Sequence, residues 1–250
     1  IACTWNEDIA ERFGQSIGKM ADEMGVSGWY APAMNIHRSA FAGRNFEYYS
    51  EDGLLSGRIA AKAITGAEQY GVYAYMKHFA LNDQETNRSN MLCTWSNEQA
   101  IREIYLKPFE ISVKEGGAKA VMSSFNYIGT RWAGGTSELC NTVLRGEWGF
   151  KGFVLTDYFG CCGYMNADQA IRGGTDAMLV AYDTATNHIK DTKSATGVRA
   201  MRQACKNVMY TVVNSRAYAP ENLQNGLMAW QVTAIVADVI LAAVLLGLEA

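Results

Sequence analysis

The stretch from Ala118 to Asp157 reads AKAVMSSFNYIGTRWAGGTSELCNTVLRGEWGFKGFVLTD and holds one complete strand–helix–strand unit. Apolar runs at residues 118–126 and 152–156 predict two strands, and residues 137–147 between them predict a helix. Because two strands joined by a helix run parallel in one sheet, this stretch predicts an α/β domain with a parallel sheet. Its second strand leads directly into a carboxylate, that of Asp157.

The same alternation continues on both sides of this unit. Further strands are expected at residues 26–34, 72–81 and 176–180, and helices at 6–24, 56–70, 97–115, 168–173 and 198–214. A closed (β/α)8 barrel has eight strands, more than the five expected here. The sequence therefore predicts an α/β fold of the (β/α)8 TIM-barrel type, incomplete in this chain, over residues 1–218. Since the chain opens on a helix, we expect the remaining strands to precede it.

Residues 219–250 are predicted to form a linker and an apolar helix. From Leu227 to Leu248 only Asp238 is charged, and about 20 apolar residues suffice to cross a bilayer. Two features oppose a membrane anchor: no Lys or Arg flanks the run, and a central Asp costs about 2.5–3.5 kcal/mol on insertion scales. A membrane anchor and a helix docked on the barrel both stay open. The location of the protein therefore also stays open between bacterial-type cytoplasmic and membrane-associated.

The composition is that of a globular protein, with 49% hydrophobic and 19% charged residues among 250. A formal net charge of -3 gives no indication of a nucleic-acid partner. None of the six cysteines shows the C-x-x-C spacing typical of a zinc site, so no metal is expected. A neutral or polar small molecule fits this balance of charges best.

Polar residues follow four of the five predicted strands, where an α/β barrel places its active site. The carboxylate of Asp157 could be a nucleophile or an acid/base group, and an N-cap of the following segment is the structural alternative. Lys77 and His78 are consecutive residues of one strand, so we expect their side chains to point to opposite faces. For His78, a buried structural histidine is the alternative.

Two arginines, Arg44 and Arg88, lie in loops that follow predicted strands, beside several acidic residues. Surface ion pairs, which contribute little energy, are the alternative reading of these arginines. Four polar strand ends at one edge of a sheet nevertheless predict a site for a strongly polar ligand.

Three segments together resemble glycoside hydrolase family 3. Residues 35–52, NIHRSAFAGRNFEYYSED, are similar to the arginine loop of its β-glucosidases, and residues 77–88, KHFALNDQETNR, to their lysine–histidine segment. Residues 144–157, LRGEWGFKGFVLTD, resemble the strand that ends in their catalytic aspartate. The order and spacing of the motifs also agree, and the likeness runs from about residue 4 to residue 218.

This resemblance implies a retaining, exo-acting β-glycosidase of the β-glucosidase type that needs no cofactor. Asp157 would be the nucleophile and form a covalent glycosyl-enzyme. The substrates would be β-glucosides or short β-linked oligosaccharides. The residues implied to bind the sugar in the first subsite are Arg44, Lys77, His78, Arg88, Met122 and Tyr158.

The chain also departs from the family pattern. The family's acid/base glutamate usually comes from a separate domain, and no equivalent segment is present, so a second domain of the same enzyme is the expected partner. The family's substrate-binding aspartate on an early strand has no counterpart. Phe125 stands where the family commonly has Tyr, and Tyr158 where Trp is frequent. A β-xylosidase or α-arabinofuranosidase, or a non-catalytic sugar-binding or structural fragment, therefore stays an alternative.

Overall fold

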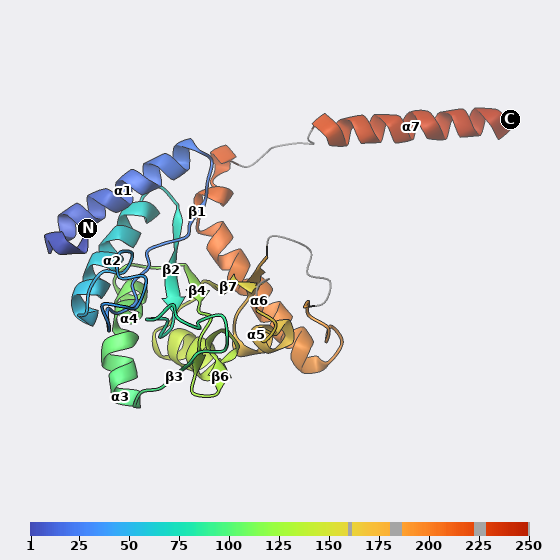
Figure 1. Cartoon of the computed structure of the whole chain (residues 1–250). Coiled ribbons are helices and arrows are strands. Elements are labelled where there is room, and N and C mark those ends of the chain that lie inside the picture. The colour runs from blue at the N-terminus through green and yellow to red at the C-terminus, as the bar shows by residue number, and fades with distance from the viewer. Residues whose placement is uncertain (160–161, 181–186, 223–228, 250) are drawn as a thin grey trace.

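The computed structural model describes residues 1–159, 162–180, 187–222 and 229–249, with side chains of the last segment described for residues 232–247 only (Figure 1). The main sheet has five strands in the order β1-β2-β4-β7-β8, and all of its neighbouring strands pair in parallel. The strands are β1 (Gly28–Trp29), β2 (Tyr73–Phe79), β4 (Ala120–Ser123), β7 (Phe153–Tyr158) and β8 (Ala177–Leu179). The predicted α/β fold, a partial barrel with a parallel sheet, is confirmed.

Helices connect these strands, as a (β/α) barrel requires. Polar N-cap side chains accept backbone N–H groups at several helix starts, as Asn6 does from Asp8 and Ile9, and Asp52 does from Leu55. The α-helices of the body are α1 (Glu7–Glu23), α2 (Gly53–Glu68), α3 (Glu98–Ala100), α4 (Lys107–Lys114), α5 (Ala167–Gly173) and α6 (Ala195–Val213). Among the described residues, the body also contains short 3-10 turns and two π-helices: η1 (Ala2–Thr4), η2 (Ile101–Tyr105), η3 (Ala133–Gly135), η4 (Glu138–Glu147), η6 (Arg216–Tyr218) and η7 (Pro220–Asn222).

The two faces of the sheet bury different side chains, because successive strand residues point to opposite sides. On one face, Met76, Val121 and Val154 pack with Ile64 of α2 and Phe109 of α4 in the largest core cluster. The other face carries a second cluster made of Tyr75, Ala120, Met122, Phe153 and Leu155. The sheet is therefore buried on both sides, and its carboxyl edge is left for polar groups.

Helices α1 and α2 lie side by side and pack at very short range (Figure 1). A Cβ atom on Gly66 would lie 2.2 Å from the carbonyl oxygen of Glu11, and one on Gly14 would lie 2.0 Å from that of Ala63. Only glycine allows backbones to approach so closely. These two positions therefore fix α1 against the sheet-covering helix α2.

Several predicted elements differ in their extent. The predicted helix at 97–115 is divided into α3, the π-helix η2 and α4, and Pro108, which has no N–H group to donate, lies in the first turn of α4. The predicted strand at 26–34 pairs regularly only at Gly28–Trp29. A small second sheet was not predicted, because its strands are too short to show a pattern: β3 (Cys93–Thr94), β5 (Tyr127–Ile128) and β6 (Arg131–Trp132).

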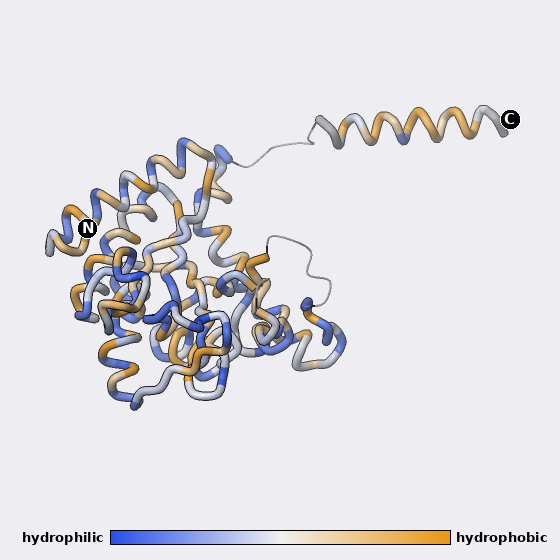
Figure 2. Tube along the Cα trace, viewed as in Figure 1, coloured by the Kyte–Doolittle hydropathy of each residue, from blue (hydrophilic) through white to orange (hydrophobic). Residues whose placement is uncertain are grey.

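The apolar C-terminal helix is present as α7 (Ala229–Glu249), and Figure 2 shows hydrophobic residues along most of its length. Its large apolar side chains, such as Val239 and Leu246, are exposed. Within the described part of the chain, no helix combines the length and the apolar character needed to cross a membrane. The predicted segment 227–248 lies partly outside the described residues.

Candidate active site

The carboxyl ends of β2 and β7 bring His78 and Asp157 together. The His78 Nε2 atom lies 3.8 Å from Asp157 Oδ2, although the two residues are far apart in the sequence and β4 lies between their strands. Both side chains are buried. The polar strand ends therefore meet at one edge of the sheet.

The two carboxylate oxygens of Asp157 have different surroundings. Its Oδ1 accepts the backbone N–H of Tyr158 at 2.8 Å, whereas Oδ2 is buried and has no hydrogen-bond partner among the described residues. An N-cap bond would run to a residue two or three positions further on, so the bond to Tyr158 is not of that kind. Burial raises the pKa of Asp157, and the Tyr158 N–H and the nearby cations of Arg88 and Arg44 oppose this rise.

His78 is held as a neutral ring. Its Nε2 lies 3.2 Å from an Arg44 NH2 group, which can only donate, so Nε2 is the acceptor and the proton is on Nδ1. Nδ1 lies 3.3 Å from the hydroxyl oxygen of Tyr48 and 3.4 Å from Oδ1 of Asn35. Burial lowers the pKa of His78 well below its usual value, and the positive charge of Arg44 lowers it further.

Two carboxylates each join two of the surrounding cations. Glu47 contacts Arg44 Nη2 at 2.6 Å and Lys77 Nζ at 3.4 Å. Glu85 contacts Arg88 Nε at 2.9 Å and Arg44 Nη1 at 3.5 Å. All these side chains are partly buried, with exposed fractions between 16% and 28%. The arginines are thus members of a linked cluster around Asp157 and not isolated surface pairs.

The expectation that Lys77 and His78 point to opposite faces is wrong. Lys77 binds Glu47 and His78 binds Arg44, so both side chains enter the same cluster. The register of β2 against β4 is irregular between Met76 and Phe79, and simple alternation therefore fails at this strand end.

Arg88, Met122 and Tyr158 lie at different depths. The guanidinium of Arg88 stacks over the Phe125 ring at 4.6 Å, next to its ion pair with Glu85. Met122 is buried in β4, within the second apolar cluster of the sheet, which also contains Tyr75 and Leu155. The half-buried Tyr158 packs against a third cluster that contains Phe125. The structure therefore places the charged residues of the predicted set together and Met122 in the apolar layer beside them.

No three His, Cys, Asp or Glu side chains of the described residues gather as metal ligands. The polar groups at this edge of the sheet are the hydrogen-bond donors and acceptors described above.

Comparison with known proteins matches this chain to one family. The model of the glycosyl hydrolase family 3 N-terminal domain matches residues 1–211. The chain belongs to glycosyl hydrolase family 3. β-Glucosidase A of Butyrivibrio fibrisolvens is 46% identical over 160 residues, which are 64% of this chain and 19% of that protein. The β-glucosidase of Rhizobium radiobacter is 44% identical over 176 residues, 70% of this chain and 21% of that protein.

Solved structures of family 3 enzymes share the fold. The structure of β-glucosidase 3B from Thermotoga neapolitana in complex with glucose covers 88% of this chain with a TM-score of 0.78 and 35% identity. Its complex with glycerol covers 90% of this chain with a TM-score of 0.80 and 37% identity. This chain spans 32% of the Thermotoga chain and about a fifth of the two relatives above.

Two further residues contact His78, although neither was given a role in the site from the sequence alone. Asn35 is buried; its Oδ1 accepts the backbone N–H of His78 at 2.7 Å, and its Nδ2 donates to the His78 carbonyl oxygen at 2.9 Å. The Tyr48 hydroxyl, beside the His78 ring, donates to the carbonyl oxygen of Asn82 at 3.0 Å. Both lie in the motif at 35–52, but an uncharged side chain within a loop gave no separate signal.

Proposed function

We propose that the chain supplies the nucleophile and the sugar-binding side of a retaining, exo-acting β-glucosidase site. The single observation that carries this proposal is the buried Oδ2 of Asp157, which has no hydrogen-bond partner in the described part of the chain and lies next to His78 within the cation cluster. A carboxylate in this setting is held ready for attack at an electrophilic carbon.

The proposed reaction has two steps. Asp157 Oδ2 attacks the anomeric carbon, the bond from that carbon to the leaving-group oxygen breaks, and a glycosyl ester forms. The leaving oxygen takes a proton from a general acid, and water then hydrolyses the ester with that group as the base. Glu47 and Glu85 each already bind two cations, which supports an acid supplied by another part of the same polypeptide.

The cations suit the hydroxyl groups of a neutral sugar. Arg44, Lys77 and Arg88 can only donate hydrogen bonds, and such charge-assisted bonds are about twice as strong as neutral ones. His78 and the two glutamates supply acceptors at the same edge. Bonds that tighten as the oxocarbenium-like transition state forms would contribute to the rate as well as to binding. The relatives named β-glucosidase, and the Thermotoga enzyme solved with glucose, support glucose as the sugar.

Labelling of the full-length protein that contains this chain tests the proposal. A fluorinated β-glucosyl reagent, which traps the glycosyl-enzyme, is expected to attach to the peptide containing Asp157, and Asp157→Asn is expected to abolish the label. Label on another carboxylate would refute the nucleophile.

A panel of aryl glycosides tests the sugar. Faster hydrolysis of the β-glucoside than of the β-xyloside or the α-arabinofuranoside is expected. The opposite order would favour the xylosidase or arabinofuranosidase alternative. No hydrolysis of any of them would favour a non-catalytic role.

A further inference from the structure

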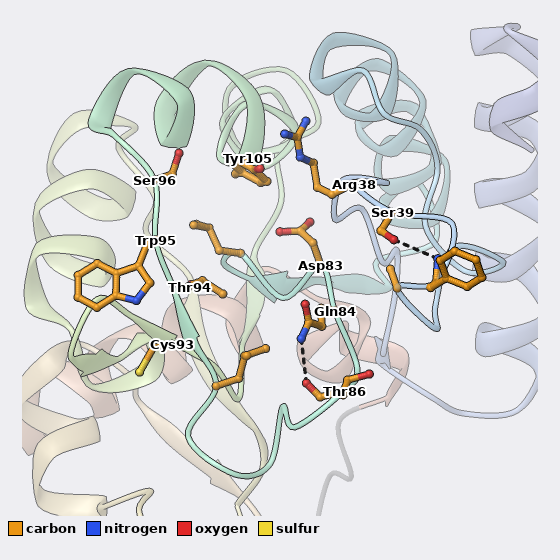
Figure 3. A pocket seen from close by; sticks show the side chains of 14 residues that line it. Arg38, Ser39, Asp83, Gln84, Thr86, Cys93, Thr94, Trp95, Ser96 and Tyr105 are labelled. Atoms are coloured by element: carbon orange, nitrogen blue, oxygen red, sulfur yellow. Dashed lines mark hydrogen bonds between the residues drawn. The ribbon is translucent and has the colours of Figure 1, made fainter.

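A cavity of about 510 Å³ (Figure 3) shares no lining residue with the cluster of Arg44, Lys77, Arg88, Glu47 and Glu85. Three segments, 38–42, 81–86 and 92–96 (the last containing β3), together with Tyr105, contribute its lining. Its volume falls within the range of about 300–1,000 Å³ that is typical of small-molecule sites. Since none of Asp157, His78, Arg44 or Lys77 lines it, it is distinct from the proposed active site.

One end of this cavity carries a guanidinium and a carboxyl group. Figure 3 shows the Asp83 carboxylate directed toward the space below Tyr105 and Arg38. Asp83 Oδ1 accepts the backbone N–H of Ile36 at 2.8 Å, which fixes the carboxylate, and the Arg38 guanidinium lies 5.5 Å from the centre of the Tyr105 ring. A guanidinium, which only donates hydrogen bonds, beside a carboxyl group, which can accept them, suits a ligand that both accepts and donates hydrogen bonds.

The rest of the lining adds neutral polar groups and aromatic surface. Thr94, Ser96 and Gln84 are among the lining residues, and Gln84 Nε2 donates to the Thr86 carbonyl oxygen at 3.1 Å. Trp95, 72% exposed, lies at the rim. Aromatic rings with a polar edge bind ligands that have one apolar face and several polar groups.

We propose that this cavity is a second binding site for a neutral saccharide, recognised by Arg38, Asp83 and Tyr105 within and by Trp95 at the rim. A pyranose ring has an apolar C–H face and a periphery of hydroxyls, which matches an aromatic rim and a paired donor and acceptor. The choice of a β-linked glucose disaccharide as its ligand rests on the proposed function.

The loop at 81–88 links the two sites. Asp83 and Gln84 line the cavity, whereas Glu85 and Arg88 in the same loop belong to the cation cluster. A saccharide held by Asp83 and Gln84 would therefore restrain the loop that positions Arg88. Occupancy of the cavity is expected to change the apparent affinity of the active site for its substrate.

Equilibrium dialysis with radiolabelled cellobiose tests the second site in the full-length protein, with Asp157→Asn in all samples to prevent turnover. Two bound disaccharides per chain are expected. Arg38→Ala is expected to weaken one of them at least about tenfold, and Trp95→Ala to weaken the same one about threefold to tenfold. Arg44→Ala should weaken only the other. Trp5→Ala removes a similarly exposed tryptophan, 78% exposed and outside the cavity lining, and should change neither.

The variants separate the two proposals. A single bound disaccharide that is sensitive to Arg44→Ala but not to Arg38→Ala or Trp95→Ala would overturn the second site and leave the active site standing. Binding sensitive only to Arg38→Ala and Trp95→Ala would support the second site and contradict the sugar-binding role of the cation cluster. One disaccharide weakened by all three variants would overturn the second site as a separate one. No binding at all would overturn both.

Discussion

Replacement of Glu47 by Gln should impair the active site because it removes one of the two negative charges that hold the cations in place. Glu47 accepts a hydrogen bond from Arg44 Nε at 2.8 Å and contacts Lys77 Nζ at 3.4 Å. Its side chain is only 25% exposed. Glutamine has the same shape, but it offers one acceptor oxygen in place of two and presents an N–H group to a cation. One of the two cations therefore loses its partner.

The size of the effect can be estimated from these contacts. A hydrogen bond to a charged group contributes about 1.5–3 kcal/mol, and partial exposure favours the lower end of that range. A loss of about 1.4 kcal/mol in the transition state corresponds to a tenfold lower rate. We therefore expect kcat/KM on an aryl β-glucoside to fall about tenfold in the full-length protein carrying Glu47→Gln.

Glu110→Gln is the matched control for this prediction. Glu110 also contacts two cations, Lys107 at 3.1 Å and Lys114 at 2.7 Å, and is 23% exposed, but it lies on α4 away from the site. Steady-state kinetics and thermal unfolding of both variants decide the question. If the two variants lose activity equally, or if Glu47→Gln keeps the parent kcat/KM, then Glu47 does not position the cations for catalysis.

Three further substitutions test the packing, the electrostatics and the support of His78. Gly66→Ala should lower the free energy of unfolding by about 1–3 kcal/mol through overpacking. Gly146→Ala, where a Cβ would meet its nearest atom at 3.4 Å, should leave that free energy unchanged. Urea unfolding that ranks the two variants otherwise would contradict the close contact between α1 and α2. Burial raises the pKa of Asp83 to about 7, so the folded state keeps a proton that the unfolded state loses above about pH 4. That group therefore makes the protein more stable as pH falls from 7 toward 4, and unfolding free energies at several pH values should lose this component in Asp83→Asn. Tyr48→Phe removes the hydroxyl that lies 3.3 Å from the His78 ring, and kcat/KM should fall about tenfold; an unchanged value would mean that the ring needs no such support.

Strand-end residues were predictable because one physical rule governs them. Asp157 follows an apolar run, and the parallel sheet then requires its carboxylate to emerge at the carboxyl edge, as the structure shows. Lys77 and His78 were found by the same rule, but their orientations were not, since the irregular register of β2 replaces simple alternation. The rule says nothing about how loops fold, so the sequence left surface ion pairs open as an alternative for Arg44 and Arg88. Only the family resemblance gave them a sugar-binding role.

Features that depend on contacts between distant segments could not be predicted. Asn35 supports His78 through two hydrogen bonds across 43 residues of sequence. No sequence pattern indicates which distant residue a single amide side chain will bind. Three separate segments form the cavity at Asp83, and none of them has a hydrophobic periodicity that could have predicted it. The division of the helix at 97–115 needed the π-helix at Ile101–Tyr105, which no propensity of those residues indicates.

The sharing of each glutamate between two cations has a consequence for selectivity. Arg44, Lys77 and Arg88 are already ordered by Glu47 and Glu85, so a ligand does not have to immobilise these long side chains itself. The same rigidity penalises an imperfect ligand, because a fixed charged donor cannot turn away to find water when a hydroxyl is absent. Sites built to bond a hydroxyl can reject the analogue that lacks it by about 10⁴-fold. Deoxy sugars of nearly unchanged size should therefore be discriminated against more strongly than bulkier sugars that keep every hydroxyl in place.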